Sequence, residues 1–340
     1  MTSDHSHASS VDDASVTAGL GPARVDAATI DEALVRSLLA DQFPGWSGLP
    51  LRPIERGGND HRMFRLGDRL SVRLPSAPGY VPQVAKEQAW LPHLSRSVPL
   101  PIPAVRGVGR PSARFPSPWS VYGWLEGEPA STAAVEDRVR FAADLAAFLV
   151  SLRSADSAGG PAPGLHSAFR GGPVAHWDEE MGDILLRVSG RERDLAAGIW
   201  RDALDASLTG TPVWIHGDVS VNNLLVRDGV LAAVIDFGCS AVGDPACDTV
   251  IEWTYFSGES RGVFRRELGL DDATWARGRG WALWKAPHHD HQQTSGAGGT
   301  RPARARRAFR PGLGRVDTNH VENTGLAGGL RTRVAIEGGG

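Results

Sequence analysis

The block between residues 213 and 248 constrains the fold more than any other part of the chain. Three short apolar runs, residues 213–216, 223–226 and 231–235, alternate there with turn residues and acidic side chains. Runs of this length bounded by turn residues are typical of strands, and Asp228-Gly229 between the last two predicts a hairpin turn. The block therefore predicts a small sheet with acidic residues at the ends of its strands.

The polar residues of this block can meet at one end of the predicted hairpin. Asp218 follows the first strand, Asn223 comes shortly after it, and Asp236 follows the third strand. Magnesium prefers oxygen ligands and takes only one or two protein carboxylates, with phosphate and water completing the shell. A carboxylate that the metal leaves free can accept the proton of an attacking hydroxyl. The arrangement therefore predicts phosphoryl transfer.

Several other classes of protein are excluded by the sequence. The 36 basic and 39 acidic residues leave a net charge of −3, so no overall basic field would attract nucleic acid. Lys86 and Lys285 follow Ala85 and Trp284, so the chain has no Gly-Lys pair and no Walker-type P-loop. The common hydrolase and zinc motifs are also missing. Two cysteines, no signal peptide and no apolar run of about 18 residues predict a cytoplasmic protein without a membrane partner.

The hydrophobic periodicity divides the chain into four parts. Residues 1–28 are predicted to be a disordered leader, and Thr29 with Glu32 forms a capping box that starts a helix to about residue 43. Residues 29–125 are predicted to form a β-rich lobe, with strands at 51–54, 63–66, 70–74, 98–105 and 119–125 and a helix at 82–91. Residues 126–286 are predicted to form a mostly helical lobe, with helices at 135–152, 174–188, 194–208, 248–256 and 274–286.

The last segment, residues 287–340, differs sharply from the rest. It is rich in glycine and arginine and has no sustained apolar period, which predicts disorder. Contact of its arginines with nucleic acid is a weaker alternative, and no nucleic-acid partner is expected. The amphipathic pattern stops abruptly after Ala286. A shift of reading frame at this point would explain the change and would leave the acidic motifs intact.

The acidic motifs resemble those of a known family. The patterns H-G-D-x-x-x-x-N, I-D-F-G and G-D-P-x-x-D, in this order, are similar to those of the aminoglycoside phosphotransferases and related small-molecule kinases. The resemblance covers roughly residues 54–285 and implies an α+β, protein-kinase-like bilobal fold. It implies that Asp218 is the catalytic base, that Asn223 and Asp236 hold Mg²⁺ on the nucleotide phosphates, and that Asp248 braces the catalytic loop through backbone hydrogen bonds.

Two further residues of these motifs are predicted to support the site. His216 is interpreted as a packed scaffold histidine rather than an acid or base. Asp244, before Pro245, is interpreted either as a turn former or as a support of the site.

The resemblance also implies nucleotide-binding residues in the first lobe. The turn Gly57-Gly58-Asn59 occupies the place of the loop that covers the nucleotide, where glycines allow close approach to phosphate. The kinase fold has a lysine on the next strand; this chain has Arg73, which binds phosphate through two parallel N–H groups. Glu87 is its predicted acidic partner.

The sequence does not determine which nucleotide donates the phosphate or which molecule accepts it. Residues 120–125, with Trp124, correspond to the hinge whose backbone meets the nucleotide base, and ATP and GTP are equally compatible with it. Asp178, Glu179, Glu180 and Asp183 form an acidic cluster, and Glu252 follows the G-D-P motif. Acidic walls suit a cationic amino sugar, although acidic residues at a helix N-terminus are favourable in any case.

An aminoglycoside-type antibiotic is therefore the leading prediction for the small-molecule acceptor, with antibiotic resistance as the biological consequence. A metabolic kinase for an amino alcohol, a sugar or a macrolide is the first alternative. The second is a nucleotide-binding homologue with impaired catalysis, suggested by Arg73 and by the absence of further C-terminal helices.

Overall fold

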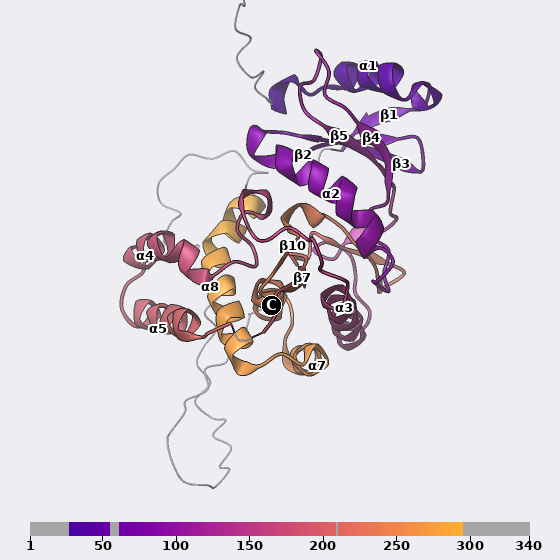
Figure 1. The fold of residues 1–340 in the computed structure, drawn as a ribbon. Coiled ribbons are helices and arrows are strands. Elements are labelled where there is room, and N and C mark those ends of the chain that lie inside the picture. The colour runs from indigo at the N-terminus through magenta and orange to yellow at the C-terminus, as the bar shows by residue number, and fades with distance from the viewer. Residues whose placement is uncertain (1–26, 55–60, 209, 295–340) are drawn as a thin grey trace, which may run out of the picture.

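The computed structural model describes residues 27–54, 61–208 and 210–294, with side chains as far as Ala286. These residues form an α+β structure of two lobes, a sheet-containing N-terminal lobe and a mostly helical C-terminal lobe (Figure 1). The predicted turn at Gly57, Gly58 and Asn59 lies outside the described residues, as do most of the predicted leader and tail. No helix in the described ranges combines the length and apolar character that crossing a membrane requires.

The N-terminal lobe is built on one antiparallel sheet with strand order β1-β2-β3-β5-β4. Its strands and main helices are α1 (Glu32–Gln42), β1 (Leu51–Pro53), β2 (His61–Leu66), β3 (Leu70–Pro75), α2 (Val81–Leu94), β4 (Val105–Gly109) and β5 (Trp119–Gly123). Side chains alternate across the strands, so Phe64, Val72 and Val121 pack with α1 in one core. The opposite face carries Arg73 and Tyr122 toward α2.

The C-terminal lobe combines helices with two small sheets. Its strands and helices are β6 (Glu128–Pro129), α3 (Arg138–Arg153), α4 (Asp178–Leu186), α5 (Arg191–Asp205), β7 (Val213–Ile215), β8 (Leu224–Arg227), β9 (Val230–Val234), β10 (Ala241–Gly243), α6 (Ile251–Thr254), α7 (Gly258–Leu268) and α8 (Asp272–Thr294). One sheet has the order β6-β8-β9, and the other pairs β7 with β10. Helices α3 and α7 pack together, as do α5 and α8.

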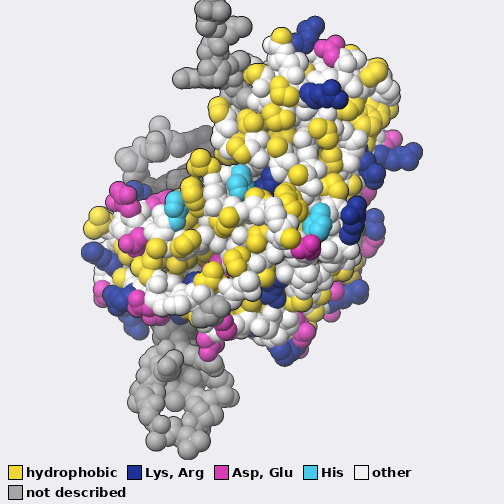
Figure 2. Space-filling view, in the orientation of Figure 1, with side chains coloured by type: hydrophobic (Ala, Val, Ile, Leu, Met, Phe, Trp, Pro, Cys, Tyr) yellow, Lys and Arg dark blue, Asp and Glu magenta, His cyan; other side chains and the backbone are white. Residues whose placement is uncertain are grey.

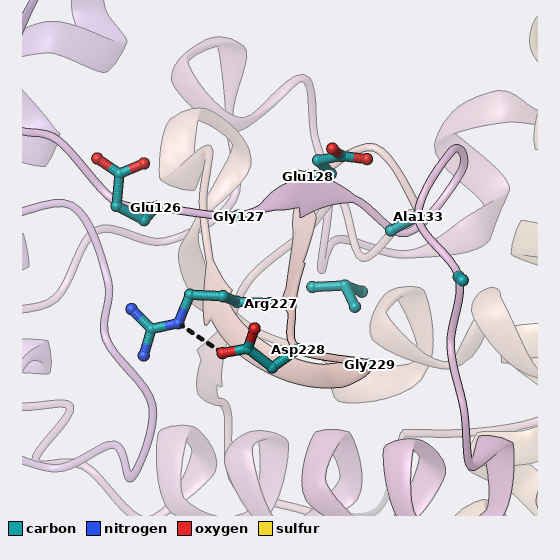
Figure 3. Close-up of a pocket in the computed structure, with 9 residues that line it drawn as sticks. Glu126, Gly127, Glu128, Ala133, Arg227, Asp228 and Gly229 are labelled. Carbon is teal, nitrogen blue, oxygen red and sulfur yellow. Dashed lines mark ion pairs between the residues drawn. The ribbon is translucent and has the colours of Figure 1, made fainter.

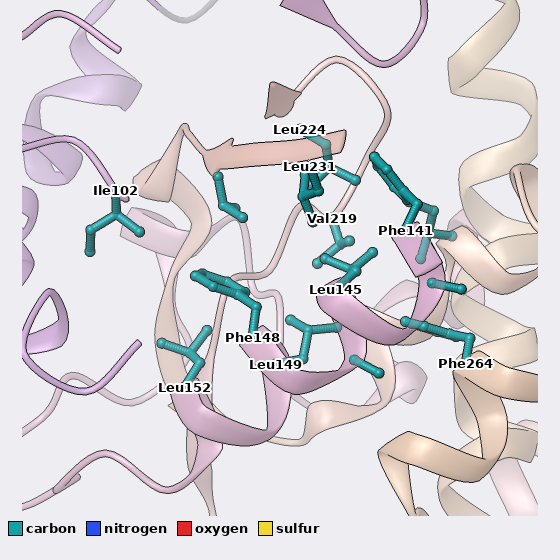
Figure 4. Close-up of a cluster of buried hydrophobic side chains, with 14 of the residues drawn as sticks. Ile102, Phe141, Leu145, Phe148, Leu149, Leu152, Val219, Leu224, Leu231 and Phe264 are labelled. Carbon is teal, nitrogen blue, oxygen red and sulfur yellow. The ribbon is translucent and has the colours of Figure 1, made fainter. Parts of the chain in front are cut away.

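Helix α3 is the centre of the largest hydrophobic core. Phe141, Leu145, Phe148 and Leu149 point from α3 toward apolar side chains that flank the acidic motifs, including Val219 (Figure 4). Removing these side chains from water stabilises the lobe by about 25 cal/mol per Å² of apolar surface. The same packing holds the backbone around the acidic motifs in a fixed position.

Several element boundaries differ from the sequence prediction. Helix α1 begins at Glu32 with Asp31 as its N-cap, because the Asp31 carboxylate accepts a hydrogen bond from the Leu34 amide (2.7 Å); the predicted cap, Thr29, belongs to a short 3-10 turn instead. Helix α2 continues through Pro92 for one further turn. The predicted strand at 98–105 lies instead at Val105–Gly109.

Sequence reasoning missed helix α7 and the strands β6 and β10, and one helix extends further than predicted. The apolar residues of α7 are few and lie between charged ones, and β6 and β10 are only two and three residues long, so none of them gives a clear periodic signal. Helix α8 continues past Ala286 to Thr294, into the segment that the sequence predicts to be a tail.

The surface carries charges of both signs. In Figure 2, basic and acidic side chains are interspersed along the lower edge of the described surface. This distribution agrees with the net charge of −3.

Candidate active site

The loop between β7 and β8 is held in place by a buried carboxylate. Asp248 accepts hydrogen bonds from the backbone N–H groups of His216 (2.8 Å) and Gly217 (2.7 Å). Burial raises the pKa of Asp248, because the charged form loses its hydration. These two hydrogen bonds satisfy backbone donors that have no strand partner, and they fix the turn that presents Asp218.

The turn itself requires glycine and a packed histidine. Gly217 has a φ of +81°, and a Cβ at this position would collide with the carbonyl oxygen of Cys239. His216 is fully buried, stacks edge-on against Phe237 at 4.7 Å, and its Nε2 lies 3.0 Å from the Ile235 carbonyl oxygen. The histidine therefore ties the loop to the chain segment that leads to Asp236.

Asp218 and Asn223 are in direct contact. The Asn223 amide nitrogen donates to the backbone oxygen of Asp218 (2.9 Å) and to its Oδ2 (3.1 Å). Both amide protons are used in these bonds, so the amide oxygen of Asn223 remains as an acceptor for a cation.

Asp236 lies beside Asn223 because of the register of the β8–β9 hairpin. Leu224 pairs with Val234, and the Ile235 amide donates to the Asn223 carbonyl oxygen at 2.9 Å. Asp236 has a φ of +65°, a conformation that non-glycine residues adopt rarely and at a cost of about 1–3 kcal/mol. Its side chain is 36% exposed, so the strained turn presents the carboxylate to solvent at the strand end.

The oxygen atoms at this strand end suit a magnesium ion. The Asn223 amide oxygen and the partly exposed Asp236 carboxylate are hard ligands, as Mg²⁺ requires. In the described part of the chain, no group of three or more His, Cys, Asp or Glu side chains could hold a metal. A magnesium ion here would thus depend on phosphate and water for the rest of its shell.

Arg73 connects Asp236 to the N-terminal lobe. Its Nη1 donates to both carboxylate oxygens of Glu87 (2.7 and 2.9 Å), and its Nη2 donates to Oδ1 of Asp236 (2.7 Å). The Tyr122 hydroxyl donates to Glu87 at 2.9 Å. Burial opposes the charge of Arg73, but Glu87 and Asp236 outweigh it and raise the pKa of Arg73. The predicted pair is therefore a buried network that spans both lobes.

Trp124 lies at the end of β5, where the hinge was predicted. Its backbone amide donates to the Arg69 carbonyl oxygen at 2.8 Å, and the Arg65 guanidinium lies 3.7 Å from the centre of its ring. Cation–π contacts of this kind contribute about 0.5–1 kcal/mol at exposed sites. Trp124 is thus fixed at the junction of the lobes.

Asp244 forms a buried ion pair rather than lying in the cluster around Asp218. Arg277 of α8 donates from Nε to Oδ2 of Asp244 at 2.6 Å and from Nη2 to Oδ1 at 3.1 Å. Both side chains are at most 5% exposed. The pair fastens α8 to the segment that follows β10, so Asp244 supports the site through the position of that helix.

Sequence reasoning missed one residue in direct contact with Asp218. Lys285, near the end of α8, forms an ion pair with Oδ1 of Asp218. Burial alone would raise the pKa of Asp218, but the positive charges of Lys285 and Arg170 outweigh it and lower that pKa. A signal was present in the sequence, because Lys285 is a single charge between the apolar run Trp281-Ala-Leu-Trp284 and Ala286.

The other lysine also lies at the site. Lys86 is buried and donates to the carbonyl oxygens of Gly238 and Ser240, each at 2.7 Å. Burial lowers the pKa of Lys86 to about 8. The contacts hold the segment that follows Asp236 against α2.

An aromatic group lies next to Lys285. Trp177 and Trp284 are 4.4 Å apart, Phe169 stacks on His176 at 3.8 Å, and the Arg170 guanidinium lies 4.4 Å from the Trp284 ring. A hollow of about 260 Å³ borders this group. Phe169 and His176 line this hollow, whereas Trp284 is buried in a hydrophobic core with Trp177 packed against it.

The predicted acidic walls are only partly present. Asp178 accepts a hydrogen bond from Trp200 (2.7 Å), and Glu180 accepts one from Trp284 (3.1 Å), so these two carboxylates fix tryptophans. Glu179 and Asp183 are exposed on α4. Glu252 is 1% exposed and pairs with Arg265 at 3.1 Å, so its carboxylate contacts another helix and does not form an exposed acidic wall.

Glu252 makes the stability of the protein depend on pH. Burial raises its pKa to about 7, and Oε2 has no hydrogen-bond partner in the described part of the chain. Since the folded pKa exceeds the unfolded one, the contribution of this group is complete below the unfolded pKa and is lost as the pH rises through about 7.

We expect Glu252→Gln to remove about 2 kcal/mol of the fall in unfolding free energy between pH 5 and pH 8. Urea denaturation at both pH values measures this difference. Glu179→Gln, on the exposed surface of α4, is the matched control and should leave the fall unchanged. An equal fall in wild type and Glu252→Gln would contradict the prediction.

A second hollow lies apart from the cluster around Asp218. It has a volume of about 440 Å³ and is bordered by Glu126 and Glu128 on one side and by the Arg227–Asp228 turn on the other (Figure 3). None of the predicted site residues lines it.

The chain matches a known protein family and resembles solved structures of phosphotransferases. The model of the phosphotransferase enzyme family, APH, matches residues 50–281. No curated protein matches the sequence. The wild-type aminoglycoside 2'-phosphotransferase-IIIa in complex with GDP has a similar structure, with a TM-score of 0.62, 21% identity, and coverage of 78% of this chain and 90% of that chain.

Two other solved structures are similar at comparable levels. The GDP and kanamycin complex of an APH(2") enzyme has a TM-score of 0.61, 20% identity, and coverage of 77% of this chain and 93% of that chain. A macrolide 2'-phosphotransferase from Brachybacterium faecium has a TM-score of 0.56, 21% identity, and coverage of 83% and 99%. At these identities the likeness shows the bilobal, kinase-like fold.

Proposed function

Because this chain belongs to the phosphotransferase enzyme family and is thus a small-molecule kinase, we propose that it transfers the γ-phosphate of ATP or GTP to a hydroxyl group of an antibiotic. One observation carries the proposal: Asp218 and Asn223, in the loop between β7 and β8, are in contact, and Asp236 follows β9, which pairs with β8 beside Asn223. Such an arrangement of a base with metal-binding oxygens is what phosphoryl transfer requires.

The proposed mechanism assigns a task to each side chain. Asp218 orients the acceptor hydroxyl and takes its proton as the acceptor oxygen attacks the γ-phosphorus and the bond to the β-phosphate oxygen breaks. Asn223 and Asp236 would hold magnesium, which when bound offsets the negative charge of the phosphates. Asp248 and His216 keep the loop in place through the contacts described above.

The N-terminal lobe supplies the proposed nucleotide contacts. Arg73, oriented by Glu87, would bind the phosphates through its planar guanidinium. Trp124 and the backbone of the hinge would meet the nucleotide base. Gly57, Gly58 and Asn59 are proposed to cover the phosphates, as the sequence predicts.

Two acceptor classes have specific support. An aminoglycoside-type antibiotic is the first candidate, supported by the exposed carboxylates of α4 and by the kanamycin complex of a structurally similar protein. A macrolide is the second candidate, supported by the aromatic group around Trp177 and Trp284 and by the macrolide 2'-phosphotransferase among the structurally similar proteins.

Acceptor-dependent nucleotide consumption tests the proposal. The purified full-length chain is incubated with Mg·ATP or Mg·GTP and with aminoglycosides, macrolides, amino alcohols and sugars, and phosphorylated products are detected by mass spectrometry. We expect transfer to one antibiotic class and its loss on chelation of magnesium. Nucleotide binding without transfer to any acceptor would instead support a catalytically impaired homologue, and transfer only to a sugar or amino alcohol would indicate a metabolic kinase.

Arg73→Lys tests the proposed phosphate contact. A lysine ammonium cannot bridge Glu87 and Asp236 as the guanidinium does, so we expect the KM for the nucleotide to rise about tenfold or more, because hydrogen bonds to charged groups contribute about 1.5–3 kcal/mol. Initial-rate kinetics measure the change. Arg69→Lys, at an exposed turn of the same sheet, is the control. An unchanged KM in Arg73→Lys would contradict the prediction that the contact requires a guanidinium, and an unchanged KM in Arg73→Met would exclude the contact.

A further inference from the structure

We infer that Lys285 is a positioning residue for phosphoryl transfer, which holds the Asp218 carboxylate in place and offsets its charge beside the transferring phosphate. The inference rests on the proposed function. Its starting point is the ion pair between Lys285 Nζ and Asp218 Oδ1, in which the lysine side chain is only 7% exposed. A buried ammonium in direct contact with the proposed base is part of the environment of the reaction.

The two oxygens of Asp218 have different partners. Lys285 binds Oδ1, and the Asn223 amide donates to Oδ2 at 3.1 Å. Two partners on opposite oxygens fix the rotation of the carboxylate plane. Each carboxylate oxygen has about two lone-pair sites, so an acceptor hydroxyl can still donate to Asp218 while both partners stay in place.

The positive charge of Lys285 reduces the electrostatic repulsion between Asp218 and the γ-phosphate. Asp218 and Asp236 lie at neighbouring strand ends, and the proposed nucleotide adds further negative charge between the lobes. A carboxylate without a cation would repel the γ-phosphate as it approaches the acceptor oxygen. Lys285 offsets this repulsion from the C-terminal lobe, while Arg73 pairs with Asp236 from the N-terminal lobe.

The use of lysine in this chain supports a specific role. Lys86 and Lys285 are the only two lysines in the sequence, among 36 basic residues. Both are buried, and both donate to segments that carry proposed site residues. A lysine ammonium is a compact point charge, whereas an arginine guanidinium is a wide planar fork, so the two are not interchangeable in a packed site.

The position of Lys285 is fixed by the packing of α8. Trp284, the preceding residue, stacks near Trp177 and donates to Glu180 at 3.1 Å. Earlier in the same helix, Arg277 forms the buried ion pair with Asp244. The packing of α8 therefore holds the Lys285 ammonium group beside Asp218.

Kinetic variants of Lys285 test the inference. With the acceptor that the wild type phosphorylates, we expect Lys285→Met to lower kcat by about 10–100-fold and to change the acceptor KM by no more than about threefold. Lys285→Arg keeps the charge and should recover part of the lost kcat. Arg266→Met, which removes an exposed positive charge from α7, is the matched control. A kcat within about threefold of wild type in Lys285→Met, or equal losses in the Met and Arg variants, would overturn the inference.

A binding measurement separates this inference from the proposed function. If Lys285 offsets charge beside the γ-phosphate, Lys285→Met should weaken binding of a non-hydrolysable Mg–triphosphate analogue about 3–10-fold, with binding of Mg·ADP unchanged. Calorimetry measures both without any turnover. A wild type that transfers phosphate to no acceptor would refute the proposed function, whereas an unchanged triphosphate-to-diphosphate ratio in Lys285→Met would refute the inference about Lys285.

Discussion

Asp218→Asn is expected to lower kcat by about 10²–10⁴-fold, which is the usual contribution of a positioned general base. The substitution keeps the size of the side chain and the possibility of a contact with Asn223, but it removes the charge that accepts a proton and pairs with Lys285. The nucleotide affinity should stay within several-fold of wild type, because the proposed phosphate contacts come from Arg73 and the metal-binding residues.

Steady-state kinetics and nucleotide titration together measure this separation of turnover from binding. Asp228→Asn is a matched control, since Asp228 lies at the turn of the β8–β9 hairpin with its side chain 91% exposed. Turnover of Asp218→Asn close to that of the wild type would exclude Asp218 as the base. A parallel loss of nucleotide affinity would mean that the substitution disturbs the loop as a whole.

Arg277→Met is expected to destabilise the protein by about 3–5 kcal/mol, because it leaves Asp244 as a buried and unpaired carboxylate. The effect should also reach the site, since the pair fastens the helix that carries Lys285. Urea denaturation measures the stability, and transfer assays under native conditions measure the activity of the folded fraction.

Two further variants give this prediction its controls. Arg36→Met breaks the exposed pair with Glu32 on α1, and pairs of this kind contribute only about 0.3–0.5 kcal/mol. Replacing both partners by apolar residues, as in Asp244→Leu with Arg277→Met, should recover part of the lost stability, because no unpaired charge then remains. A change below about 1 kcal/mol in Arg277→Met would show that the pair does not hold α8.

Much of the candidate site could be predicted because its residues are close together in the sequence. Asp218, Asn223 and Asp236 lie within one hairpin-containing block, where local strand and turn preferences already determine which side chains share an end. The α+β bilobal fold followed from the same motifs, and the family match agrees with it. Arg73 and Glu87 were paired correctly from the resemblance, and the structure places them in contact.

The errors lie where distant segments decide the outcome. Glu252 was one candidate for an acidic wall, but it is buried and pairs with Arg265 of α7, a helix that the sequence did not reveal. Asp244 could not be assigned between a turn and a support, because its partner Arg277 is far along the chain. Lys285 was recognised only as evidence against a P-loop, since no local pattern connects it to Asp218.

The sequence by itself determined that Asn223 and Asp236 flank one hairpin with Asp218 close before it, because strand pairing and turn preferences act locally. Only the tertiary structure decided how that cluster is charged and held: Lys285 and Arg277 both come from α8, and their partners Asp218 and Asp244 come from earlier loops. Periodicity predicts the buried face of a helix but not the carboxylate that its charged residues meet. That choice depends on how the helix packs, and therefore on the whole C-terminal lobe.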